Sequence, residues 1–182
     1  MEEGVVMLID GIPAAMTRIQ VDAFDSLIDY FRVTAFIELG TFKGGLACHF
    51  VNRQKRTKKV RRYDREFKYY GFECDREVID PRMLPHITIA DVTHLETIDT
   101  IRNLVNSSIG PVIIFCDTNN KPREMLTYGK LLRVLDIVIG HDYPGEITDE
   151  FLNKYGREHP NLQEIGGPVY RSQGYSAWIR IR

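Results

Sequence analysis

The chain has 182 residues, 43% of them hydrophobic, which is enough apolar surface for one core, and a single domain over residues 1–182 is expected. Its 24 basic and 25 acidic residues give a net charge of −1, so the overall charge provides no argument for a nucleic-acid partner. No run reaches the roughly 18 apolar residues of a membrane-spanning helix, and the acidic start MEEG is unlike a secretory signal, so a cytoplasmic protein is expected.

The first elements are a helix, a strand and a second helix. The helix is expected over residues 17–32, where Thr17 and Gln20 form a capping box ahead of an apolar stripe. A strand over residues 35–40 then runs into a glycine-containing turn, and a helical pattern begins at the Gly44-Gly45 pair.

Two further strands follow a basic stretch. They are expected over residues 69–73 and 86–90, and the second is followed by a helix from about Thr93. Thr93 and Glu96 have the spacing of a second capping box. The three cysteines of the chain form no CxxC pair, so neither a disulfide framework nor a zinc ribbon is indicated.

The second half continues the alternation. Residues 112–116 form an apolar run typical of a strand buried on both faces, and a helix is expected over residues 122–132, with proline in its first turn. A fifth strand is expected over residues 137–140, a short helix over 148–155, and a closing strand over 176–180. The alternation predicts an α/β protein, a Rossmann-like three-layer αβα sandwich whose mostly parallel sheet ends in an antiparallel C-terminal hairpin.

A glycine and several carboxylates lie within or just after the predicted strand ends: Glu38, Gly40, Glu73, Asp91, Asp117 and Asp142. In an open α/β sheet, ligands bind outside the carboxyl ends of the strands, at the point where the strand order reverses. A carboxylate at such a position is also a common cap of the following helix, which is the alternative for each residue taken singly.

The segment ELGTFKG over residues 38–44 resembles the E-x-G-x-x-x-G first motif of class I S-adenosylmethionine-dependent methyltransferases, especially small-molecule O-methyltransferases related to catechol O-methyltransferase. Gly40 is expected to leave room for a ligand near the backbone, and Gly44 to allow close packing at the helix start. The G-x-G-x-x-G spacing of nicotinamide dehydrogenases is absent.

The resemblance implies that S-adenosylmethionine is the cofactor. It places Glu73 on the ribose hydroxyls, with Asp75 as the alternative, and Asp91 on the adenine amino group, unless Asp91 is only a cap or turn residue before Thr93. The full set of cofactor-binding residues that it implies is Glu38, Gly40, Phe42, Gly44, Glu73, Asp91 and Asp117.

The second half of the resemblance concerns the ends of the fourth and fifth strands. In metal-assisted O-methyltransferases of sugars and natural products, acidic residues there bind a magnesium-like ion, and the matching residues are Asp117, His141 and Asp142. A histidine ligand favours manganese or a softer ion over magnesium. The expected catalytic residues are Asp117 and His141. The alternative to a metal site is that His141 acts as the general base and no metal binds. The lysine base of catechol-type enzymes is replaced by Asn120, with Lys121 adjacent.

The acceptor is expected to be the hydroxyl of a small molecule. A non-catalytic adenosylmethionine-binding module is one alternative, and an RNA-directed methyltransferase is another, because residues 53–68 hold nine of the 24 basic residues. DNA base methylation is disfavoured, no membrane partner is expected, and assembly into a homo-oligomer is left open.

Overall fold

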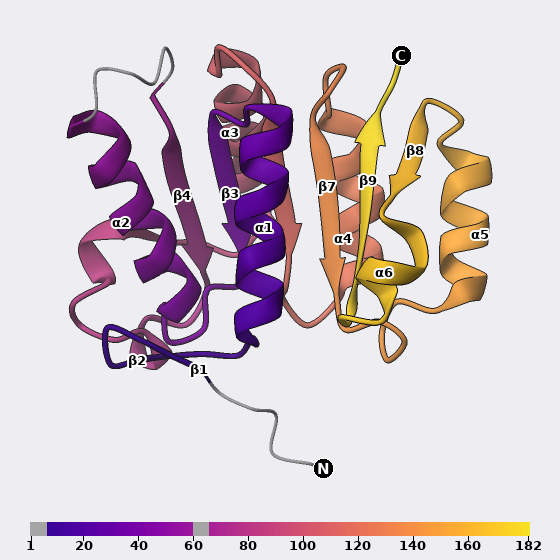
Figure 1. Cartoon of the computed structure of the whole chain (residues 1–182). Coiled ribbons are helices and arrows are strands. Elements are labelled where there is room, and N and C mark those ends of the chain that lie inside the picture. The colour runs from indigo at the N-terminus through magenta and orange to yellow at the C-terminus, as the bar shows by residue number, and fades with distance from the viewer. Residues whose placement is uncertain (1–6, 60–65) are drawn as a thin grey trace.

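A seven-stranded sheet forms the centre of the computed structural model, which describes residues 7–59 and 66–182. The parallel strands are β3 (Ala35–Leu39), β4 (Lys68–Glu73), β5 (Ile87–Ile89), β6 (Val112–Cys116) and β7 (Ile137–His141). Strand β9 (Tyr175–Arg180) runs antiparallel to both of its neighbours, β7 and β8 (Leu162–Ile165). The order across the sheet is β5-β4-β3-β6-β7-β9-β8 (Figure 1). The predicted parallel sheet with an antiparallel C-terminal pair is confirmed.

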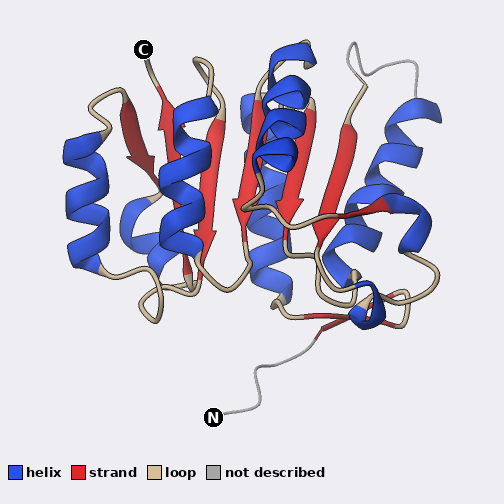
Figure 2. Ribbon diagram, turned by 180° about the vertical axis from the view of Figure 1, so that it is seen from behind, coloured by secondary structure: helices blue, strands red, loops and turns tan. Residues whose placement is uncertain are grey.

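Helices cover both faces of the sheet, as Figures 1 and 2 show from opposite sides. One face carries α1 (Arg18–Phe31), α2 (Gly45–Lys59) and α6 (Gly167–Arg171), and the other carries α3 (Leu95–Ser107), α4 (Lys121–Tyr128) and α5 (Asp149–Glu158). Alternate residues of each central strand belong to different apolar clusters, so that Phe36 packs on the first face and Ile37 on the second. The three-layer sandwich is therefore confirmed.

The central strands β3 and β6 are buried at every position because both faces of the sheet are covered. They lie in register from Ala35 opposite Val112 to Leu39 opposite Cys116. After β3 the chain forms β4 and β5 on one side of this strand, and it then crosses over to form β6 on the other side. The strand order therefore reverses between β3 and β6, which makes this pair the switch point of the fold. The segments that follow β3 and β6 are consequently brought together.

The helix starts test the two predicted capping boxes. The box of Thr17 and Gln20 at α1 is confirmed, with both of its hydrogen bonds present. The box of Thr93 and Glu96 is wrong: His94 occupies the N-cap position of α3 without a side-chain capping hydrogen bond, and the Thr93 hydroxyl instead donates to Asp91. Because α3 begins at Leu95, Glu96 is the second residue of the helix rather than the third, and the spacing of a capping box is lost.

Several short elements are additional to those predicted. A two-stranded hairpin, β1 (Met7–Ile9) and β2 (Ile12–Ala14), packs against α2, and the short helix α6 lies between β8 and β9. Single 3₁₀ turns occur at η1 (Arg76–Val78), η2 (Leu84–His86) and η3 (Gly129–Leu131), the last of which ends the predicted helix over residues 122–132. Among the described residues, no helix has both the length and the apolar character needed to cross a bilayer.

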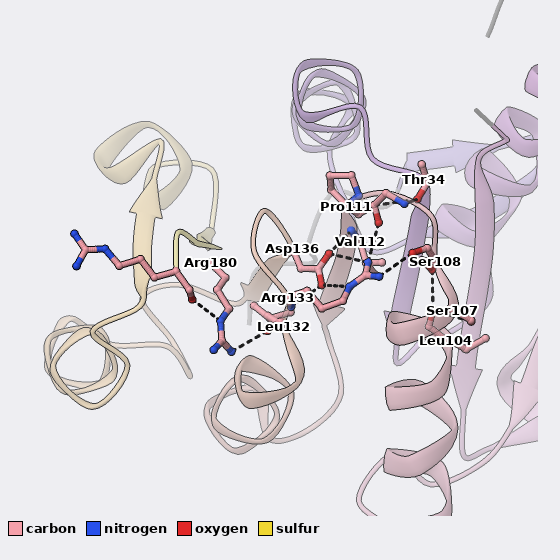
Figure 3. Close-up of polar contacts among 12 residues, drawn as sticks. Thr34, Leu104, Ser107, Ser108, Pro111, Val112, Leu132, Arg133, Asp136 and Arg180 are labelled. Carbon is pink, nitrogen blue, oxygen red and sulfur yellow. Dashed lines mark hydrogen bonds and ion pairs between the residues drawn. The ribbon is translucent and has the colours of Figure 1, made fainter. Parts of the chain in front are cut away.

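A buried carboxylate ties the starts of β6 and β7 together at the end of the sheet opposite the switch-point loops (Figure 3). Asp136 is fully buried and accepts hydrogen bonds from the Val112 N–H at 2.9 Å and from the Arg133 N–H at 2.7 Å. The Arg133 guanidinium binds the same carboxylate and donates to the carbonyls of Ser108 and Gly110. These contacts make Asp136 the anchor of the loop before β7.

Asp136→Ala is expected to lower the free energy of unfolding by about 2 kcal/mol, because it leaves the buried Val112 N–H without an acceptor. Denaturant unfolding followed by circular dichroism measures the change. Asp99→Ala removes an exposed aspartate of α3 and is expected to cost less than about 0.5 kcal/mol. Equal stabilities of the two variants would contradict the anchoring role of Asp136.

Candidate active site

The loop that joins β3 to α2 has an unusual backbone. Gly40, Phe42 and Gly44 all have positive φ, at 86°, 50° and 88°. A Cβ atom on Gly40 would lie 2.6 Å from the Asp117 carbonyl oxygen, so the space beside Gly40 is filled by the chain that follows β6. This corrects the expected reason for Gly40: the missing side chain admits a neighbouring backbone rather than a ligand. A Cβ on Gly44 would crowd the Met83 side chain at 3.0 Å, which agrees with close packing at the helix start.

The Glu73 carboxylate lies at the end of β4 and holds this loop. Its Oε2 accepts a hydrogen bond from the Phe42 N–H at 2.9 Å, and its Oε1 accepts from the N–H groups of Cys74 and Asp75. Inside the same loop, the Thr41 hydroxyl is buried without a hydrogen-bond partner among the described residues. An unpaired buried hydroxyl is costly unless another group satisfies it. The loop therefore combines a placed carboxylate with an unsatisfied polar atom.

Glu38 lies beneath the loop rather than at its surface. It is 2% exposed and accepts a hydrogen bond from the Tyr69 hydroxyl at 2.6 Å. Burial raises the pKa of Glu38 to about 8, against the opposing effect of that hydrogen bond, so the carboxyl group keeps its proton at neutral pH. This hydrogen bond joins the neighbouring strands β3 and β4.

Asp91 follows β5 and forms a turn with Thr93, which is the alternative that the sequence offered to a role at the adenine. Its Oδ1 accepts from the Thr93 N–H at 2.8 Å and from the Thr93 hydroxyl at 2.7 Å. The hydrogen bond from the Thr93 N–H, helped by the hydroxyl, lowers the pKa of Asp91 and keeps it ionised. A small pocket between α3 and α4 lies next to this turn and is lined by Val92, Thr93, Ile98, Asn120, Arg123, Glu124, Thr127 and Tyr128.

Asp117, His141 and Asp142 come together at the ends of β6 and β7. One nitrogen or oxygen from each of them lies within 4.8 Å of the others, as the binding of a single ion requires. His141 Nδ1 is 2.8 Å from Asp117 Oδ1 and 3.6 Å from Asp142 Oδ1. Asp142 has a positive φ of 62°. Of the three side chains, that of Asp142 is the one that is substantially exposed. Two carboxylates and an imidazole are a donor set that suits a divalent ion.

Lys121 places a positive charge against this cluster. Its ammonium group, on the first residue of α4, lies 2.6 Å from Asp142 Oδ2 and 3.0 Å from Glu146 Oε1. The Lys121 side chain is only 7% exposed, whereas its partners Asp142 and Glu146 are 46% and 38% exposed, so the ion pairs lie at the surface of the site. Burial lowers the pKa of Lys121, but its hydrogen bonds to Asp142 and Glu146 and the charges of Asp117 and Asp142 together outweigh burial and raise it, so the amine stays charged.

Burial and charge oppose each other in the pair of Asp117 and His141. Burial raises the pKa of Asp117 by more than the hydrogen bond to His141 lowers it. Burial lowers the pKa of His141, but the hydrogen bond to Asp117 and the charges of Asp117 and Asp142 together outweigh burial and raise it. The pKa of each group is thus higher than in water, so each binds its proton more firmly.

No protein-family model matches the sequence, and a search of curated proteins finds no match. Solved structures do match. A structure of CmcI with Mg and SAM has a TM-score of 0.73 at 15% identity, over 97% of this chain and 77% of that one. A putative caffeoyl-CoA O-methyltransferase from Staphylococcus aureus has a TM-score of 0.61 at 14% identity, over 93% and 86% of the two chains. The chain has the class I methyltransferase fold. TomG, an O-methyltransferase from Streptomyces achromogenes solved with SAM, has a TM-score of 0.51 at 12% identity, over 95% and 84%.

The methyltransferase fold gathers polar side chains at the site that the sequence patterns did not single out. In the sequence, Lys121 stands out only as the neighbour of Asn120, and its position on the first turn of α4 is what directs it to Asp142. Asn120 itself caps that helix by accepting from the Arg123 N–H. Gln20 was noted only for its capping box, yet its amide also reaches His141.

Proposed function

We propose that the chain binds S-adenosylmethionine beside the loop of residues 40–44 and transfers its methyl group to a hydroxyl of a small-molecule acceptor. The observation that carries the proposal is the convergence of this loop, Glu73 and the cluster of Asp117, His141 and Asp142 on one edge of the sheet, at the switch point of a methyltransferase fold. Ligands of open α/β sheets bind at this edge.

The residues near Gly40 suit an adenosyl cofactor. Glu73, held by backbone N–H groups, offers acceptor oxygens to a ribose diol, and the unpaired Thr41 hydroxyl offers one more polar contact in the loop. Asp91 follows the next strand, β5, and the pocket between α3 and α4 lies beside its turn, where the adenine would be held. S-adenosylmethionine supplies a methyl group activated by its sulfonium charge.

The residues at the ends of β6 and β7 suit the acceptor. In the proposed reaction the acceptor oxygen forms a bond to the methyl carbon while the carbon–sulfur bond breaks, its electron pair stays on sulfur, and the hydroxyl proton passes to a base. Asp117 and Asp142 would hold a divalent ion, which lowers the pKa of a bound hydroxyl. His141 is either a third ligand or the base, and Lys121 lies within the same cluster.

Glu73→Ala is expected to weaken S-adenosylhomocysteine binding at least about tenfold, or about 1.4 kcal/mol, because the ribose acceptor and the anchor of the Phe42 N–H are lost together. Isothermal titration calorimetry measures the affinity. Glu77→Ala, an exposed glutamate four residues away, is expected to bind as the wild type does. Wild-type affinity in Glu73→Ala would remove Glu73 from the cofactor site.

A turnover assay separates the enzyme from a non-catalytic adenosylmethionine-binding module. Transfer of labelled methyl groups to a panel of small hydroxyl compounds, with RNA as a further acceptor, is expected to give methylated small molecules. Adding a chelator tests metal assistance, since a metal-free base mechanism retains its activity. S-adenosylhomocysteine binding without transfer to any acceptor would favour the module.

A further inference from the structure

Gln20 connects the first turn of α1 to the proposed active site. Its side chain is almost fully buried, and its Oε1 accepts from the Thr17 N–H at 2.7 Å and from the Thr17 hydroxyl at 3.1 Å. In Figure 1, the N-terminal end of α1 lies at the same edge of the sheet as the end of β7. The capping box therefore presents one side of the Gln20 amide to the helix and the other side to the site.

The hydrogen bonds determine which way the Gln20 amide points. A backbone N–H can only donate, so the atom facing the Thr17 N–H must be the amide oxygen. The NH₂ group on the other side donates to the Gln173 carbonyl oxygen at 2.5 Å. Reversing the amide would place a donor against the Thr17 N–H and an oxygen against the Gln173 carbonyl, losing both contacts.

The fixed amide in turn constrains the imidazole of His141. The Gln20 NH₂ group lies 3.4 Å from His141 Nε2, so that nitrogen faces a donor and is suited to present its lone pair. The single proton of the neutral ring then belongs on Nδ1, where the Asp117 carboxylate accepts it at 2.8 Å. Ligation of an ion through Nδ1 would require moving that proton to Nε2, against the Gln20 NH₂ group.

We propose that Gln20 is a positioning residue that holds His141 in its Nδ1–H tautomer, so that His141 is a hydrogen-bond donor to Asp117 and not an ion ligand through Nδ1. The functional meaning of this tautomer rests on the proposed methyl transfer, but the tautomer itself does not. It assigns the ion-binding part of the site to the oxygen ligands of Asp117 and Asp142, which magnesium prefers. Of the two roles considered for His141, it disfavours ligation through Nδ1.

The test is ¹⁵N NMR of the imidazole rings at alkaline pH, where His141 is neutral, with its resonances assigned by their loss in His141→Ala. In the wild type, Nδ1 is expected to carry the proton and Nε2 to lack it, both without and with Mg²⁺. Gln20→Glu replaces the NH₂ group by a carboxylate oxygen and is expected to draw a proton onto Nε2. Gln20→Met, which has no donor and only a weakly accepting sulfur, is expected to give a mixture of the two tautomers.

Gln163→Glu makes the same chemical change on the exposed side of β8 and is expected to leave the His141 signals unchanged. Three outcomes would each overturn the proposal. The wild-type ring carries its proton on Nε2, the proton moves to Nε2 when Mg²⁺ is added, or the His141 signals are unchanged in both folded Gln20 variants. Calorimetry with S-adenosylhomocysteine on the same samples keeps the two proposals separate: absent binding with the expected NMR signals would reject only the cofactor assignment.

Discussion

Gly40→Val is expected to weaken S-adenosylhomocysteine binding by at least about 100-fold, or about 2.8 kcal/mol. Two physical costs combine at this position. A β-branched residue at a φ of 86° is strained, and its Cβ would lie 2.6 Å from the Asp117 carbonyl oxygen. The loop of residues 40–44 and the chain after β6 would have to move apart, which disturbs the cofactor site and the acceptor site together. Calorimetry gives the affinity, and circular dichroism shows whether the fold is retained.

Gly11→Val is the matched control for this prediction. Gly11 has a similar φ of 77°, but nothing lies within 4 Å of the Cβ it would gain. This variant carries the backbone strain without the collision, and it is expected to bind S-adenosylhomocysteine within about twofold of the wild type. If Gly40→Val keeps its affinity, or if both variants lose it equally, the close approach of Gly40 and Asp117 is not what shapes the site.

Asp117→Asn is expected to weaken divalent-ion binding by at least about 100-fold while S-adenosylhomocysteine still binds. The asparagine oxygen can still accept the His141 Nδ1–H, so the geometry is retained and only the negative charge is lost. Calorimetry with Mg²⁺ and with Mn²⁺ measures the ion affinity, and the methyl-transfer assay is expected to show a matching loss of turnover.

Asp22→Asn removes a carboxylate from the exposed surface of α1, where it pairs with Arg18, and is expected to change neither ion binding nor turnover. Wild-type ion affinity in Asp117→Asn would place the ion elsewhere. Turnover that survives chelation in the wild-type protein would favour the base role of His141 over metal assistance.

The central strands could be predicted closely from the sequence because burial on both faces gives them unbroken apolar runs, as in residues 112–116, which match β6 fully. The elements that were missed lack such a signal. Strands β1 and β2 have three residues each, and β8 has the sequence LQEI, which is half polar because it lies at the edge of the sheet. Their positions depend on tertiary contacts with α2 and β9.

The convergence of strand-end residues was predictable because topology alone brings Asp117 and His141 to one edge of the sheet. Their hydrogen-bond partners were not predictable. Lys121 reaches Asp142 because Lys121 is the first residue of α4. Gln20 reaches His141 although 121 positions of sequence separate them. The role of Gly40 also depended on tertiary structure, since the backbone that occupies the space of a Cβ on Gly40 is that of Asp117, the residue after β6.

Calorimetric titration of the wild-type protein with S-adenosylhomocysteine, NAD and ATP tests the central claim most directly, because it identifies the cofactor class before any acceptor is known. The account predicts one S-adenosylhomocysteine bound per chain and no measurable binding of NAD or ATP at the same concentrations. Binding of NAD or ATP in preference to S-adenosylhomocysteine would contradict it.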